Sequence, residues 1–167
     1  MVTLETTVLI KGIVAREIYD FMLNLTDTDY QQWWQGTHLV CHTVKKYPGN
    51  IGNLIYVDEY VGKYRLKGYA VVAKLVPYQE IVYQIIILIK IPAWFIMKFE
   101  EGPDGIKIIH VVKAGFNGLG KVFDPLIRLF LTNEFEKHLT AHAQEEFPKL
   151  ASLLAKRSSL SKAGQAH

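Results

Sequence analysis

A histidine and a glutamate lie one helical turn apart near the C-terminus, in a stretch whose apolar residues repeat at helical spacing. If residues 135–154 form an α-helix, roughly 80° of its surface carries Phe135, Leu139, His142, Glu146, Leu150 and Leu153. An ionised carboxylate in an apolar interior costs several kcal/mol unless another group pairs with it. His142 and Glu146 therefore predict a buried polar site with partners from elsewhere in the chain, unless the stripe ends early and both lie at a solvated edge.

Strand alternation directs further histidines toward the same interior. Charged residues of a half-buried strand face water, so Lys107 and Lys113 leave His110 on the inward face of residues 106–113. His38, at the start of a strand that follows a short helix, is another inward candidate. Taken singly, either histidine could instead be a hydrogen-bonded residue of the core or of its rim.

An acidic pair on another predicted strand supplies a second carboxylate. Asp58 and Glu59 are adjacent, so they must face opposite sides of that strand. Glu59 shares its side with Ile55, Val57 and Val61, whereas Asp58 shares its side with Leu54, Tyr56 and Tyr60. The aliphatic side is the better candidate for the interior, so we expect Glu59 to point inward. The alternative is a solvated acid close to a turn.

Two imidazoles and two carboxylates that converge on one interior form a ligand set used by zinc and by other divalent metals. The sequence predicts zinc or another divalent cofactor bound by His38, Glu59, His110 and Glu146. These residues are scattered along the chain, so the prediction rests on their convergence and not on a local spacing motif. His142 could replace one of the ligands or transfer protons, and Tyr64 or Tyr83 could also handle protons.

The remaining inward positions are apolar. Alternation leaves aliphatic and aromatic side chains inside three strands, and the C-terminal helix and a glycine-rich connector at residues 115–120 contribute one side chain each. The predicted pocket lining comprises Leu66, Ile85, Ile87, Phe95, Met97, Phe99, Phe116 and Leu139. Such a lining is typical of a site for a hydrophobic or aromatic small molecule. The glycines of the connector predict a mobile lid over this pocket.

Length and composition limit the class of protein. The 167 residues, half of them hydrophobic, indicate one globular domain, expected at residues 1–156. The formal charge of +3, with scattered lysines and arginines, argues against a nucleic-acid partner. The single Cys41 favours a reducing compartment. There is no signal-peptide pattern, and Lys90 and Pro92 interrupt the most apolar stretch, Ile81–Met97, so we expect a cytoplasmic protein without a membrane span.

Turn residues divide the chain into an ordered set of elements. A strand at 3–11, a helix at 15–25 and a short helix at 27–34 come first. Six strands follow, at 38–46, 53–60, 64–76, 80–90, 94–100 and 106–113, and short turns make neighbours antiparallel. Asp124 and Pro125 predict the start of the last helix. Residues 157–167 are expected to form a disordered tail.

This order predicts an α+β fold, in which a seven-stranded antiparallel sheet curves around the long C-terminal helix. Over Thr3–Leu154, the order of elements and the glycine-rich connector before the last helix resemble the Bet v 1/START-like (SRPBCC, polyketide cyclase/dehydrase-like) helix-grip superfamily. The resemblance implies a cavity between sheet and helix for an apolar or aromatic small molecule. It does not choose between an enzyme and a carrier.

The order His, Glu, His, Glu, with the last acid in the C-terminal helix, resembles the diacetylphloroglucinol hydrolase branch of this superfamily. That resemblance implies zinc in the cavity, held by His38, Glu59, His110 and Glu146. It also implies cleavage of a carbon–carbon bond next to an acyl group.

Three hypotheses for the function follow. The first is a metal-dependent hydrolase or lyase that acts on an aromatic or polyketide-like ketone. The second is a carrier or sensor that binds a hydrophobic ligand without chemistry. The third is a metal-free cyclase or dehydratase in which burial raises the pKa of Glu146 and makes it an acid or base. Stoichiometric metal would separate the first from the others, and either a monomer or a homodimer is compatible with the sequence.

Overall fold

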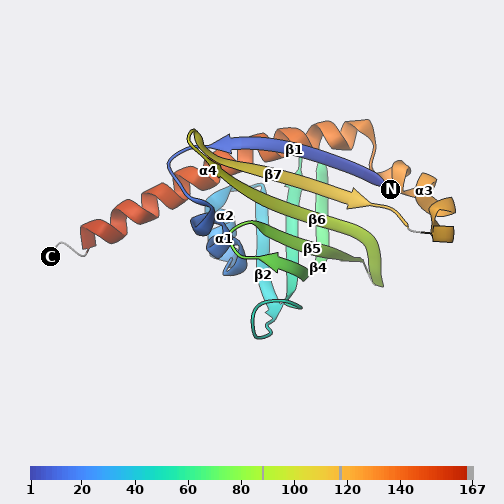
Figure 1. The fold of residues 1–167 in the computed structure, drawn as a ribbon, viewed down its shortest axis with the longest axis horizontal. Coiled ribbons are helices and arrows are strands. Elements are labelled where there is room, and N and C mark those ends of the chain that lie inside the picture. The colour runs from blue at the N-terminus through green and yellow to red at the C-terminus, as the bar shows by residue number, and fades with distance from the viewer. Residues whose placement is uncertain (88, 117, 165–167) are drawn as a thin grey trace.

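The computed structural model describes residues 1–87, 89–116 and 118–164 (Figure 1). A strand and two short helices come first: β1 (Val2–Ile10), α1 (Ala15–Leu23) and α2 (Asp27–Trp33). Six strands follow: β2 (His38–Lys45), β3 (Leu54–Val61), β4 (Tyr64–Val76), β5 (Glu80–Ile87), β6 (Ile89–Gly102) and β7 (Gly105–Ala114). The 3-10 helix η1 (Gly118–Phe123), α3 (Asp124–Phe130) and α4 (Asn133–Gly164) come last.

The seven strands form one antiparallel sheet in the order β1-β7-β6-β5-β4-β3-β2. Neighbours in this sheet are also neighbours in sequence, except that β1 pairs with β7, with Val2 opposite Ala114. The sheet curves, α4 lies against its concave inner face, α2 lies close to β2, and α1 contacts β6 (Figure 1). The predicted α+β helix-grip architecture is thus confirmed.

Alternating and helical burial patterns produce this arrangement. On β1 the inward residues Leu4, Thr6, Val8 and Ile10 are buried while their neighbours are exposed or half-buried. On α4 the buried apolar residues recur every three or four positions, at Phe135, Leu139, Ala143, Phe147, Leu150 and Leu154. Burying each large apolar side chain stabilises the fold by about 1.5–3 kcal/mol. The inner face and α4 therefore hold each other in place.

The last helix begins later than the sequence predicted. Asp124 and Pro125 open the separate short helix α3, and α4 begins at Asn133. The hydroxyl of Thr132 accepts a hydrogen bond from the backbone N–H of Phe135 at 3.1 Å, which caps the new helix. A second capping residue therefore starts a second helix. The prediction of a single helix that begins at Asp124 is wrong.

α4 continues through residues 157–164, part of the stretch for which the sequence predicts a disordered tail. Arg157 explains the first part of this extension. Its guanidinium donates to the Asp29 carboxylate at 2.7 Å and to the Gln32 side-chain oxygen at 2.9 Å, and both partners belong to α2. No helix in the described part of the chain is long and apolar enough to cross a membrane.

The connector that was predicted to be a lid is partly fixed by hydrogen bonds. The N–H of Gly115 donates to the carbonyl of Pro92 at 2.9 Å, and the N–H of Phe116 donates to the carboxylate of Asp124 at 2.8 Å. From Gly118 the chain continues as η1, whereas residue 117 lies outside the described residues. The lid remains a prediction.

Gly105 permits a close approach between the β6–β7 turn and β1. Its φ is +131°, and a Cβ at this position would lie 2.2 Å from the carbonyl oxygen of Ile10. We therefore expect Gly105→Ala to lower the free energy of unfolding by about 1–3 kcal/mol, measured by denaturant titration. Gly102→Ala in the same turn is the control, because a Cβ there would meet its nearest neighbour at 3.8 Å and should cost little. Equal stability of the two variants would contradict this interpretation.

Candidate metal centre

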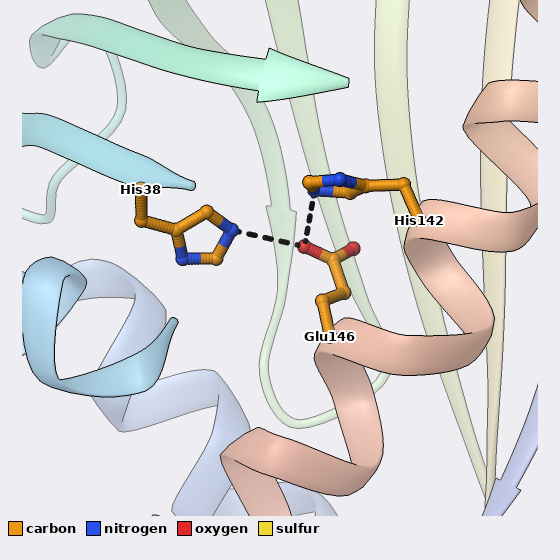
Figure 2. Close-up of side chains that lie close together, drawn as sticks. All are labelled: His38, His142 and Glu146. Carbon is orange, nitrogen blue, oxygen red and sulfur yellow. Dashed lines mark ion pairs between the residues drawn. The ribbon is translucent and has the colours of Figure 1, made fainter. Parts of the chain in front are cut away.

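Four polar side chains from β2, β3 and α4 meet between the sheet and the helix. His38 and Glu59 are cross-strand partners in the β2–β3 register, so both side chains project from the same face at the same level. His142 and Glu146 lie one turn apart on the face of α4 that looks toward them. Figure 2 shows His38, His142 and Glu146 with both rings directed at one carboxylate oxygen.

The distances within this group are short but exceed those of hydrogen bonds. The Glu146 Oε2 atom lies 3.3 Å from the Nε2 of His142 and 3.6 Å from the Nε2 of His38. Glu59 Oε2 lies 3.8 Å from each of the same two nitrogens. An N–H···O hydrogen bond is typically about 2.7–3.2 Å long. The Nε2 atoms of both histidines therefore lie close to both carboxylates, and within the described residues neither of them makes a hydrogen bond.

The group is buried, and several of its nitrogens have no partner. His38 is 1% exposed and His142 and Glu146 are each 6% exposed. Within the described residues, both ring nitrogens of His38 and the Nε2 of His142 lack any hydrogen bond. Leaving a buried polar atom unsatisfied costs about 1–3 kcal/mol. Buried polar atoms without a hydrogen-bond partner are rare in folded proteins, so these nitrogens are candidates to bind an ion or another ligand.

A divalent cation fits the donors that are present. Zinc binds imidazole nitrogens and carboxylate oxygens at about 2.0–2.2 Å, so two tetrahedral ligands are about 3.4 Å apart. The four nitrogen–oxygen separations, from 3.3 to 3.8 Å, are close to that value. His38, His142 and Glu146 each offer a ligand atom within 4.8 Å of the others. The residue types and their spacing thus suit a metal ion.

Three aromatic residues of α2 and its C-terminal end hold the site residues. The ring of Tyr30 stacks on His38 at 4.0 Å and 5°, and its hydroxyl donates to Glu59 Oε2. Trp34 stacks on His142 with ring centres 4.7 Å apart. Trp33 donates its indole N–H to the backbone carbonyl of Glu146 at 2.6 Å. These contacts restrict the rotamers of both histidines and fix one turn of α4.

The two carboxylates differ in electrostatic environment. Burial alone would raise the pKa of Glu146, but the facing imidazoles of His142 and His38 outweigh it and lower the pKa to about 2. At Glu59, burial and the nearby Glu146 carboxylate raise the pKa. The carboxylates raise the pKa of His142 against the effect of burial. The raised pKa that was expected for Glu146 is therefore found at Glu59, and that expectation was wrong.

His110 faces inward, but like Glu59 it is not one of the three residues whose ligand atoms all lie within 4.8 Å of one another. Its ring packs against Phe95, with ring centres 4.6 Å apart, and its Nδ1 has no hydrogen-bond partner among the described residues. Strand alternation gives the face of a residue but not its position across the sheet. β7 is separated from β3 by β6, β5 and β4, and the residue that groups with His38 and Glu146 is His142.

The two tyrosines predicted to transfer protons lie in different places. Tyr64 is half-buried at the start of β4, and its hydroxyl donates to Glu134 at 3.3 Å. Tyr83 is buried in the core, where its ring stacks on Phe95, and burial raises its pKa. The tyrosine that touches the group is Tyr30. Tyr30 lies eight residues before His38, on a helix that leads into β2, and this position could have indicated that it reaches the site. The aromatic residues of that helix suggested core packing instead.

The predicted pocket lining lies on the inner side of the sheet and at the connector. Met97, Phe99 and Leu139 are buried, Leu66, Ile85, Phe95 and Phe116 are half-buried, and the side chain of Ile87 lies outside the described part. Two surface hollows of about 430 and 440 Å³ lie elsewhere, beside the β6–β7 turn and beside the start of β1. The pocket between sheet and helix remains a prediction.

Comparisons with known proteins define the class of fold. No protein-family model and no curated protein sequence matches the chain. Solved structures do match over nearly its whole length, and they have the Bet v 1-like helix-grip fold.

Three of these structures illustrate the likeness. A Staphylococcus aureus protein of unknown function is 12% identical, with a TM-score of 0.58 over 95% of this chain and 96% of that one. Ginseng major latex-like protein 151 from Panax ginseng is 7% identical, with a TM-score of 0.54 over 84% and 95%. The di-domain ARO/CYC protein StfQ of the steffimycin biosynthetic pathway is 18% identical, with a TM-score of 0.55 over 97% of this chain and 51% of that one. At these identities the likeness concerns the fold.

Proposed function

We propose that this protein binds a divalent metal, zinc in the first place, through His38, Glu59, His142 and Glu146. We further propose that it acts as a hydrolase or lyase on a ketone of an apolar or aromatic small molecule. The observation that supports the proposal most strongly is a buried pair of imidazoles whose unpartnered nitrogens face two carboxylates at 3.3–3.8 Å. A bound divalent ion would supply the means to polarise a carbonyl or to acidify a water molecule.

The chain's own residues supply orientation and access. Tyr30 fixes the Glu59 carboxylate by hydrogen bonding and the His38 ring by stacking. Glu59 has 19% of its side chain exposed, compared with 8% for Glu146. A small molecule would therefore approach from the side of Glu59, and Glu146 would remain the inner ligand.

Elemental analysis and thermal unfolding test the metal site directly. We expect purified protein to carry close to one zinc per chain, and protein stripped with EDTA to regain it. Zinc at about 100 times its dissociation constant should stabilise the stripped protein by about 2.7 kcal/mol. For a chain of this size that raises the melting temperature by roughly 5–10 °C. His42→Ala, which removes a surface histidine 2.8 Å from Asp27, is the control and should leave both results unchanged. Trace metal content and an unaltered melting temperature would contradict the proposal.

A second candidate is metal-free acid–base chemistry, and the raised pKa of Glu59 favours it specifically. A protonated Glu59 beside the ionised Glu146 would provide an acid and a base in one site. Turnover that persists in EDTA would support this candidate. Ligand binding with neither turnover nor metal would support the carrier hypothesis.

A further inference from the structure

The outer face of the sheet, which points away from α4, is unusually apolar over β3 to β6. An antiparallel sheet with one face on the core normally carries polar residues on the other face. Here the outward positions include Leu54, Tyr56, Tyr69, Val71, Ile86 and Trp94. Tyr56 lies opposite Tyr69, with ring centres 5.2 Å apart, and Tyr69 lies opposite Ile86. These side chains therefore form one apolar patch over β3 to β5, and Trp94 on β6 adjoins it across the polar Gln84, the cross-strand partner of both Val71 and Trp94.

The patch is accessible in the isolated chain. Tyr69 is 44% exposed, and the other members of the patch are half-buried. α4 lies on the other side of the sheet, α2 lies close to β2, and α1 contacts β6 (Figure 1). Apolar residues on both faces also explain why Ile81–Met97 is the most apolar stretch of the sequence. Strands of this composition are normally buried on both sides.

Lysines surround the patch and lack ion-pair partners. Within the described residues, no carboxylate lies within 4 Å of the amino groups of Lys45, Lys67, Lys98 and Lys113. Lys45 is the cross-strand partner of Leu54, and Lys113 that of Trp94, so both lie at the edge of the patch. The nearby acids Asp58 and Glu80 are already paired, with Arg65 at 2.8 Å and with Lys74 at 2.6 Å.

The positive charge of these four lysines, which form the rim of the patch, indicates the kind of partner that the patch would bind. A second copy of the chain, docked face to face, would bring two basic rims together. An anionic bilayer surface is complementary to them, since lysines at such a surface each strengthen binding. Tryptophan and tyrosine are also the residues that concentrate at the boundary between headgroups and acyl chains. We propose that the outer face of β3–β6 binds peripherally to a bilayer surface that contains anionic phospholipids. This proposal is independent of the metal site.

Co-sedimentation with lipid vesicles tests the proposal. The protein should bind phosphatidylcholine vesicles that contain about one third phosphatidylserine, bind pure phosphatidylcholine poorly, and be released by high salt. Lys67→Glu changes the local charge by two units and should weaken binding roughly 30-fold. Tyr69→Asp should also weaken it, and because Tyr69 is 44% exposed, the melting temperature should change little.

Two matched variants at the far end of α4 serve as controls. Lys156→Glu makes the same charge change, and Leu160→Asp alters a side chain that is 63% exposed, and neither should affect vesicle binding. Failure of the protein to bind the anionic vesicles would overturn the proposal, as would equal weakening by the controls. A dimer in sedimentation equilibrium that Tyr69→Asp dissociates would assign the patch to a second copy of the chain and would also overturn it. Metal content, measured on the same samples, should not change.

Discussion

Replacing Glu146 by glutamine is expected to lower the affinity of the protein for zinc at least about 100-fold, because it removes an anionic donor at the inner end of the site. The amide keeps the shape of the side chain, so the fold should persist. His142 should lose the carboxylate that raises its pKa. Metal content and zinc affinity, measured on stripped and reloaded protein, check the expectation.

Glu145→Gln is the matched control for this variant. Glu145 is the adjacent residue on α4, has 60% of its side chain exposed and pairs with Lys149 at 3.2 Å. Loss of such a surface ion pair costs at most about 1 kcal/mol, and it should leave the metal content unchanged. If Glu146→Gln binds zinc as tightly as Glu145→Gln does, Glu146 is not a ligand. The main reason to prefer a metal enzyme would then be lost.

Acid is expected to destabilise the metal-free protein through His110. Burial lowers the pKa of His110 to about 4 from an ordinary value near 6.5, against the opposing effect of the Glu146 carboxylate and with a smaller lowering effect from His142. Between these two pH values the unfolded chain binds the proton and the folded chain does not, so the free energy of unfolding falls as the pH falls. At neutral pH the lowered pKa of His110 contributes about 3 kcal/mol to the free energy of unfolding. Roughly 2 kcal/mol of this stabilisation is lost by pH 5.

The raised pKa of His142 acts in the opposite direction, because its stabilisation is fully present at low pH and is lost as the pH rises through its folded value. Comparing variants separates the two effects. Urea unfolding of His110→Phe at pH 7 and pH 5, in EDTA, should show a smaller loss of stability on acidification than the unmodified protein. His42→Phe, at a histidine whose side chain is 44% exposed, should retain the full loss. Identical pH dependence of all three proteins would exclude His110 as the cause.

Most of the fold could be predicted because alternation and helical spacing are local properties of a sequence. Most strands were expected close to their observed places, since turn residues divide the chain regularly, but β6 begins at Ile89, five residues before the predicted start, and Pro92 lies within it and not in a turn. The boundary between α3 and α4 was missed, because the strong start signal at Asp124 hid a second cap at Thr132. The C-terminal extension was missed because contacts from Arg157 to α2 are remote in sequence.

The site was harder to predict than the fold. Periodicity assigned Glu59, His110 and Glu146 to the interior, and His38 was an inward candidate from its place at the start of a strand. The structure places all four on the inner side. Periodicity cannot say which inward residues lie at the same position across seven strands, so it could not show that His142, and not His110, groups with His38 and Glu146. Tyr30 was also missed as a site residue, because its role depends on how α2 packs onto β2.

The pairing of β1 with β7 also has a consequence for how the chain folds. Val2 lies opposite Ala114, so the partner strand of β1 is made by the ribosome more than a hundred residues later. α4, which also contacts β1, is made later still. Until then β1 has an unsatisfied edge that can pair with other chains. Refolding should therefore be slow for a domain of this size, and nascent chains that end before β7 should be the species that most need a chaperone.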